Sequence, residues 1–130
     1  MKKAHKIVMV LLLAAGSVLA SMDIYSEIGD AIRSGDARAV ARYFNSTVDL
    51  TILNQEEVYS KAQAEQVLRD FFSRNTPKSF TLIHKGVSKE GAKYAIGEMV
   101  TAQGAQFRTY FWVKQNGGSE SIKELRFEKQ

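Results

Sequence analysis

Four runs of β-branched and aromatic residues between Phe80 and Phe127 constrain the fold of this 130-residue chain more than any other feature. Turn signals separate the runs at 88–91, 103–104 and 116–118. In the third run, Phe107, Thr109, Phe111 and Val113 alternate with Arg108, Tyr110 and Trp112. Strict period two is a strand signal, and short connections between consecutive strands favour an antiparallel meander. The sequence therefore predicts a four-stranded antiparallel sheet.

The first twenty residues have the pattern of a secretory signal. Lys2, Lys3 and Lys6 precede an apolar run at 7–15, and small residues follow at 18–20. The apolar run is short for a membrane span, so we expect a cleaved signal peptide at 1–20 and one domain at 21–130. A retained N-terminal anchor is the alternative. The expected location is outside the bacterial cytoplasm, periplasmic or secreted, with no integral membrane segment after cleavage.

Charge and cysteine content exclude several kinds of partner. Loss of the three signal lysines lowers the net charge from +4 to +1, and the remaining Lys and Arg residues are scattered. A nearly neutral domain lacks the basic patch that binds nucleic acid, so no nucleic-acid partner is expected. The chain has no cysteine, which excludes disulfides, thiolate metal sites and a lipid on cysteine. We expect no metal and no cofactor.

Capping and periodicity signals predict three helices before the sheet. The first covers about 22–34, with Ser21 or Asp23 as its cap and Gly35 just past its end. Asp36 is expected to cap a second, short helix that carries Phe44 on its apolar face and ends at 45–46. A short strand at 48–52 and a polar loop at 54–57 follow. Ser60 and Gln63 form a capping box for the third helix, which stops before Pro77.

The turns suggest a register for the sheet. A two-residue turn at 103–104 would set Glu98 opposite Thr109 and Tyr94 opposite Val113. A longer loop centred on Gly118 would set Phe111 against Leu125 and Thr109 against Phe127. This register places six residues on the surface away from the helices: Met99, Arg108, Tyr110, Trp112, Ile122 and Arg126.

The order of elements and several short motifs resemble the nuclear transport factor 2-like (cystatin-like) superfamily, a cone-shaped α+β fold. The motifs are Ile32-Arg33-Ser34-Gly35-Asp36, Tyr43-Phe44 and Phe71-Phe72. Further motifs are similar to an uncharacterised family of small exported bacterial proteins with this fold: Tyr59-Ser60-Lys61-Ala62-Gln63-Ala64-Glu65, Ser79-Phe80, His84-Lys85-Gly86 and Tyr94-Ala95-Ile96-Gly97. The resemblance implies three helices on a curved four-stranded meander plus one short strand. It implies little about function, because the fold hosts enzymes and binding proteins alike.

The ketosteroid isomerases of this superfamily do not share their chemistry with this chain. Their catalytic tyrosine falls on Ile28 and their aspartate base on or near Ile52, and isoleucine neither donates a hydrogen bond nor takes a proton. The remaining candidate base is Glu98, since a carboxylate enclosed by apolar side chains can act as a general base. His84 is also expected to face inward, where a structural role and a dyad with Glu98 are the alternatives.

Three functions remain open at this stage. The first is an exported, non-enzymatic binding domain that holds a small apolar ligand between sheet and helices or associates through its outer sheet face. The expected pocket lining is Tyr43, Phe71, Tyr94, Glu98, Thr109 and Phe111. The exposed aromatic residues favour a homodimer through the outer face. The second is a lyase or isomerase with Glu98 as base, and the third is a purely structural envelope protein without a pocket.

Overall fold

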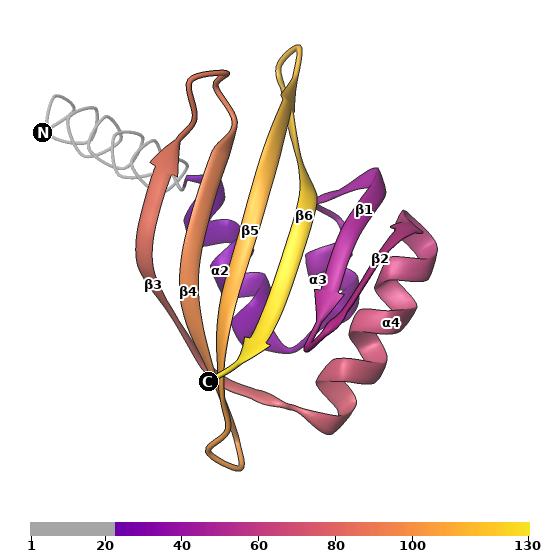
Figure 1. Ribbon diagram of the computed structural model, residues 1–130, viewed down its shortest axis with the longest axis vertical. Helices are drawn as coiled ribbons and strands as arrows, with labels where there is room; N and C mark the ends of the chain where they lie inside the picture. Colours follow the sequence, from indigo (N-terminus) through magenta and orange to yellow (C-terminus); the bar gives the residue numbers. More distant parts are fainter. Residues whose placement is uncertain (1–22) are drawn as a thin grey trace, which may run out of the picture.

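The computed structural model describes residues 23–130, which form helices on one side of a six-stranded sheet (Figure 1). The elements in chain order are α2 (Ile24–Ser34), α3 (Ala37–Ala41), β1 (Phe44–Ile52), β2 (Gln55–Ser60), α4 (Lys61–Arg74), β3 (Pro77–Val87), β4 (Lys93–Thr101), β5 (Gln106–Asn116) and β6 (Ser119–Lys129). The predicted signal peptide at 1–20 lies outside the described residues. None of the described helices is long and apolar enough to cross a membrane.

The sheet confirms the predicted meander and adds a strand. Its order is β2-β1-β6-β5-β4-β3, with β1 parallel to β6 and every other pair antiparallel. The α+β class is therefore right, but the sheet is mixed and has six strands. The predicted polar loop at 54–57 is wrong, because Gln55–Ser60 is an edge strand. Its side chains are mostly exposed, so it carries no alternation of apolar and polar residues that would signal a strand.

The predicted helix caps are present. The Asp23 side chain accepts a hydrogen bond from the Ser26 backbone N–H at 2.8 Å and so begins α2. Gly35 ends this helix in the left-handed region at φ 70°. The capping box of Ser60 and Gln63 begins α4. These signals act within a few residues of the chain, which makes them readable from sequence.

The second helix is shorter than expected. It ends at Ala41, and Phe44 begins β1 beside Ile122 of β6. Phe44 is buried, but its side chain reaches the core from a strand and not from a helix. Residues 45–46 therefore belong to β1 and do not terminate α3.

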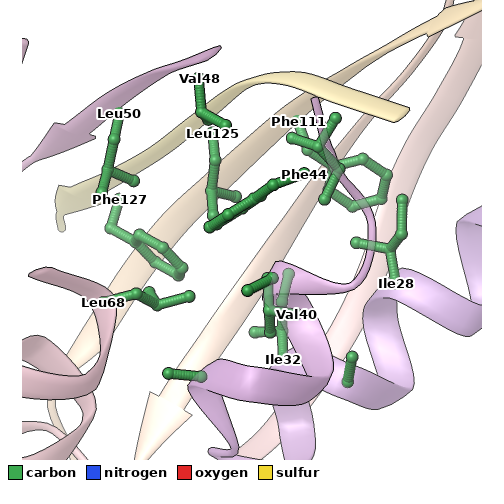
Figure 2. Packing of buried hydrophobic residues seen from close by; sticks show 14 of the residues in the cluster. Ile28, Ile32, Val40, Phe44, Val48, Leu50, Leu68, Phe111, Leu125 and Phe127 are labelled. Carbon is green, nitrogen blue, oxygen red and sulfur yellow. The ribbon is translucent and has the colours of Figure 1, made fainter. Parts of the chain in front are cut away.

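The helices and the sheet enclose a filled core. Figure 2 shows side chains from β1, β5 and β6 pointing toward those of the helices, among them Phe111, Leu125 and Ile32. The Phe71 ring of α4 lies 5.3 Å from the Phe107 ring and 4.8 Å from the Phe127 ring, centroid to centroid. Close packing of this kind stabilises the domain and leaves the space under the centre of the sheet occupied by protein side chains.

The other face of the sheet is not covered by helices. The α2 helix packs on β3, and α4 packs on β1, β2 and α3, all from the same side. In Figure 1 the helices α2 and α3 lie behind the sheet, and the face turned toward the viewer is uncovered. We call this uncovered surface the outer face.

Candidate functional site on the outer face of the sheet

The β4–β5 register differs by one residue from the predicted one. The Thr101 backbone N–H donates to the Ala105 carbonyl at 2.8 Å, so three residues, 102–104, form the loop in place of two. Gly104, at φ 89°, supplies the left-handed position that this kind of loop needs. Glu98 therefore pairs with Arg108, and Tyr94 pairs with Trp112. A shift of one residue turns every side chain of a strand to the other face.

This shift separates the six residues of the predicted ligand pocket. Phe71, Thr109 and Phe111 are buried in the core. Tyr94 and Glu98 lie on the outer face with the partners named above. Tyr43 is half-buried between α3 and β1, where burial and the nearby Glu27 carboxylate raise the pKa of its hydroxyl. The predicted lining is therefore not one site in this structure.

The β5–β6 pair has the predicted register in its central part. Phe111 lies opposite Leu125, and Thr109 lies opposite Phe127. The turn itself is the tight Gly117–Gly118 pair, at φ 48° and 94°, and the register is restored by a bulge next to Trp112.

Two residues predicted for the outer face are in the core. The bulge in the β5–β6 pair moves Ile122 to the inner side, and the loop of three residues does the same to Met99. Both side chains are fully buried. The predicted interface is therefore wrong at these two positions, whereas Arg108, Tyr110, Trp112 and Arg126 do lie on the outer face.

Pairing across the strands arranges the outer face in three rows. The first row is Asp49, Glu124, Trp112 and Tyr94; the second is Thr51, Arg126, Tyr110, Ile96 and His84; the third is Glu128, Arg108, Glu98 and Thr81. The first row runs from acidic to aromatic side chains. The third, which we call the charged row, places Arg108 between two carboxylates.

An open groove of about 430 Å³ lies across these rows. It is lined by Ile96, Arg108, Tyr110, Glu124, Arg126 and Glu128. An apolar floor with charged walls of both signs suits a partner surface or a polar ligand. This groove and the side chains around it are the candidate functional site.

Arg126 is the centre of a charge cluster beside the groove. Its guanidinium contacts the Glu124 carboxylate and lies 3.8 Å from that of Glu56. Burial opposes the charge of Arg126, but Glu124 beside it prevails and raises the pKa of the guanidinium. The Arg126 guanidinium also lies 5.8 Å from the ring of Tyr110, whose pKa is raised by burial and then by Glu124.

Three carboxylates of this cluster come from three strands. Ligand oxygens of Asp49, Glu56 and Glu124 lie within 4.8 Å of one another, a spacing that would also suit a divalent cation. The guanidinium of Arg126 already supplies positive charge there. The sequence pattern places Glu56 in a polar loop and does not indicate that the three carboxylates meet. The alternation Glu124-x-Arg126-x-Glu128 was the available signal, since it indicates a charged strand face.

An aromatic strip extends the site toward β3. The Tyr94 and Trp112 rings are nearly parallel, at 13°, with centroids 5.9 Å apart. His84 lies 6.0 Å from Tyr94 and is exposed, because a bulge near Ile83 turns it away from the inner side where it was predicted. Among the described residues no hydrogen bond joins His84 to Glu98, so the hypothetical dyad is not formed.

Comparison with known proteins fits the fold described above. The family profile named "Domain of unknown function (DUF4783)" matches residues 25–128. The chain belongs to the DUF4783 family. A DUF4783 protein of Bacteroides fragilis is 26% identical, with a TM-score of 0.75 over 85% of this chain and 100% of that one. No curated protein matches the chain.

Other solved structures agree on the fold of this DUF4783 domain. A family member from Bacteroides uniformis is 25% identical, with a TM-score of 0.76 over 83% of this chain and 98% of that one. An NTF2-like protein of unknown function from Shewanella baltica is 14% identical, with a TM-score of 0.61 over 99% and 94%. The NTF2-like fold implied by the sequence resemblance is therefore confirmed. The Bacteroides fragilis relative is matched over its full length, so helices and sheet of this arrangement fold by themselves in that protein.

Ile28 and Ile52, the two positions that were compared with the catalytic residues of the isomerases, both lie in apolar surroundings. Ile28 is fully buried in the core cluster, and Ile52 packs against that cluster at the end of β1.

Proposed function

We propose that this DUF4783 protein is an exported, non-enzymatic interaction domain that forms a homodimer through the outer face of its sheet. Export rests on the signal pattern at 1–20. Self-association rests on the outer face, which carries the groove, the aromatic strip and the charged row. Aromatic and arginine side chains are enriched at protein interfaces, and Tyr94, Tyr110, Trp112 and Arg108 supply both kinds here.

The charged row is the observation that carries the proposal. Within the described residues, Arg108, Glu98 and Glu128 form no ion pair, although they are cross-strand neighbours. By contrast, Arg126 of the same face does form an ion pair within the chain, with Glu124. A twofold axis placed between β4 and β5 would set Arg108 of each copy against Glu98 of the other, so this pair of strands is complementary to itself.

The twofold axis has a natural place near the groove. Rotation about it would set Arg108 of one copy against Glu98 of the other, and Tyr110 of one copy against Ile96 of the other. Interface cores of this type combine aromatic contacts with a polar rim. Because buried side chains fill the space between the sheet and the helices, the alternative of an apolar ligand held beneath the sheet has less support.

The alternative of a lyase or isomerase with Glu98 as base has less support. Glu98 is half-buried on the outer face opposite Arg108, and the tyrosine that shares its strand, Tyr94, stacks on Trp112. Neither arrangement encloses a substrate between an acid and a base.

A charge-swap experiment tests the proposal. The domain of residues 21–130 is prepared as wild type, as Arg108→Glu, and as Glu98→Lys with Glu128→Lys, and its mass is measured by light scattering after size exclusion. We expect the wild type to be a dimer and each variant alone to be a monomer, because like charges then face each other. An equimolar mixture of the two variants should again form a dimer, since both contacts become opposite in sign.

Three results would separate the parts of the proposal. A wild-type monomer at the highest soluble concentration would overturn self-association. A dimer that survives in every variant would place the interface elsewhere. The Lys114→Glu variant is the matched control, because Lys114 lies on β5 beyond the groove and its reversal should leave the dimer intact.

A further inference from the structure

The turn between β1 and β2 contains a strained residue. Leu53 has φ 58°, and every other described residue with positive φ is a glycine. Ile52 pairs with Gln55, so Leu53 and Asn54 form a two-residue turn of a kind that normally has glycine at its first position. A leucine side chain in this region of φ is unfavourable.

Burial does not explain why a leucine occupies this turn. Its side chain is 45% exposed, although leucine is favoured in cores. The backbone is fixed independently of the side chain, because the Leu53 N–H donates to the Phe127 carbonyl at 2.8 Å. Strained residues that the surrounding structure holds in place are concentrated at binding and switch sites.

Leu53 forms the lip of a cleft between the β1–β2 turn and the last part of α4. The cleft has a volume of about 510 Å³ and is lined by Ile52, Leu53, Asn54, Gln55, Val67, Asp70, Phe71, Arg74 and Asn75. It shares no lining residue with the groove on the outer face. Its volume is within the range of small-molecule sites.

The apolar part of the cleft is rigid. Phe71 is only 5% exposed, and its ring packs against those of Phe107 and Phe127. Ile52 and Val67 are half-buried and pack on the same core. A flat apolar group placed there would contact side chains that are already fixed, so binding would require little ordering of the protein.

The polar part of the cleft favours an uncharged ligand. Asp70 and Arg74 lie in the wall, but they form an ion pair with each other at 3.3 Å. Together these two side chains therefore give the cleft no net charge. Three carboxamide side chains, those of Asn54, Gln55 and Asn75, also line the cleft. Carboxamides both donate and accept hydrogen bonds, which suits an amide or a hydroxyl group.

We propose that this cleft binds a small, uncharged amphipathic molecule. Its apolar ring or chain lies against Ile52, Val67 and Phe71 under the lip formed by Leu53, and its amide or hydroxyl end meets the carboxamides. The cleft shares no lining residue with the groove, so either site can fail without the other.

Three probes that share one ring test the chemistry: 2-phenylacetamide, phenylacetate and 2-phenylethylamine. Each is titrated into the ¹⁵N-labelled domain of residues 21–130 while the backbone amide signals are followed. We expect 2-phenylacetamide to give saturable shifts confined to residues 52–55 and 67–75, with a dissociation constant of about 1 mM, as ligand-efficiency limits allow for so small a probe. The two charged probes should bind more weakly. No saturable shifts, shifts centred elsewhere, or equal binding of all three probes would overturn the proposal.

Two variants separate binding from folding. Leu53→Asn and Leu53→Gly remove the apolar lip and place residues that tolerate positive φ in the turn, so the melting temperature should not fall. The affinity for 2-phenylacetamide should decrease about threefold, as expected for the loss of a few buried methylene contacts. Val58→Asn is the matched control, because Val58 is an aliphatic residue of β2, 65% exposed and outside the cleft. Unchanged affinity in both Leu53 variants, or an equal loss in the control, would contradict the proposal.

Discussion

Glu98 of β4 lies directly opposite Arg108 of β5, on the face of the sheet that the helices do not cover. The next residue along β4, Met99, is fully buried and lies opposite Phe107. One residue thus separates a charged surface position from the centre of the core. The length of the loop at 102–104 determines which of the two residues faces inward.

Substitutions at these neighbouring positions should differ widely in their effect on stability. Met99→Ala removes a buried side chain and should lower the free energy of unfolding by about 2–5 kcal/mol. Glu98→Gln changes a surface position without an ion pair and should alter it by no more than about 0.5 kcal/mol. Urea unfolding of both variants measures the difference. Equal effects of the two changes would contradict the register described here.

The features that were predictable from sequence are the local ones. A side chain that caps a helix acts within three or four residues, as Asp23 and Ser60 do, and strand alternation needs only the strand itself. The meander followed from short connections between alternating runs. The family resemblance was predictable for the same reason, since its motifs lie within these elements.

The features that were missed depend on one extra residue or on distant strands. The sequence around Gly104 is compatible with a loop of three residues and with a turn of two residues. The difference of one residue determines which face of the sheet each side chain of β4 occupies. The bulge between Ile122 and Glu124 has no sequence signal of its own. The acid cluster joins Asp49, Glu56 and Glu124, and it forms only because β1 pairs with both β2 and the last strand.

Gly97 should not tolerate even one methyl group. An added Cβ would overlap the Phe80 ring and would lie 2.9 Å from the Thr81 carbonyl oxygen, which belongs to the backbone. Gly97→Ala should therefore destabilise the domain by about 1–3 kcal/mol, as overpacking does. Phe80→Leu frees part of the space, so thermal unfolding of the double variant should show less than the sum of the two single losses. Strict additivity would mean that Phe80 is not the obstacle.

The Asp23 cap should give the domain a pH dependence in acid. The hydrogen bond from the Ser26 backbone N–H, opposed in part by burial, holds the pKa of the Asp23 carboxyl below its ordinary value, and Lys85 at 3.4 Å acts in the same direction. A carboxyl with a lowered folded-state pKa stabilises above its unfolded value, near 4, and this stability is lost as the pH falls through the folded value.

Two variants at this cap distinguish the hydrogen bond from the charge. Asp23→Ala should lower the free energy of unfolding by about 1 kcal/mol at pH 7, whereas Asp23→Asn keeps an oxygen acceptor and should lose less. The difference between wild type and Asp23→Asn should shrink as the pH falls through the folded-state pKa of Asp23, because the carboxyl then loses its charge. Denaturant unfolding at pH 7 and over a series of acid pH values measures this, and a difference that grows in acid would reverse the expected sign.

Removal of Arg126 should leave three carboxylates without their central positive charge. Glu124 and Glu56 lose the guanidinium that lies between them, and Asp49 remains within 4.8 Å of both. Arg126→Gln should therefore destabilise the domain by about 1–3 kcal/mol at pH 7, since it leaves like charges close together on a partly buried surface. Added salt should recover part of this loss through screening.

Arg69→Gln is the control for this effect, because it removes an arginine from an exposed helical pair with Glu65 at 2.7 Å. Such pairs contribute about 0.3–0.5 kcal/mol, so the control should remain close to wild type in melting temperature at every pH. If Arg126→Gln behaved like Arg69→Gln, the acids around Arg126 would already be separated by water, and the cluster would have no part in holding β1, β2 and β6 together. Comparing the variant in sodium and in calcium salts of equal ionic strength would show whether a divalent ion takes the place of the guanidinium.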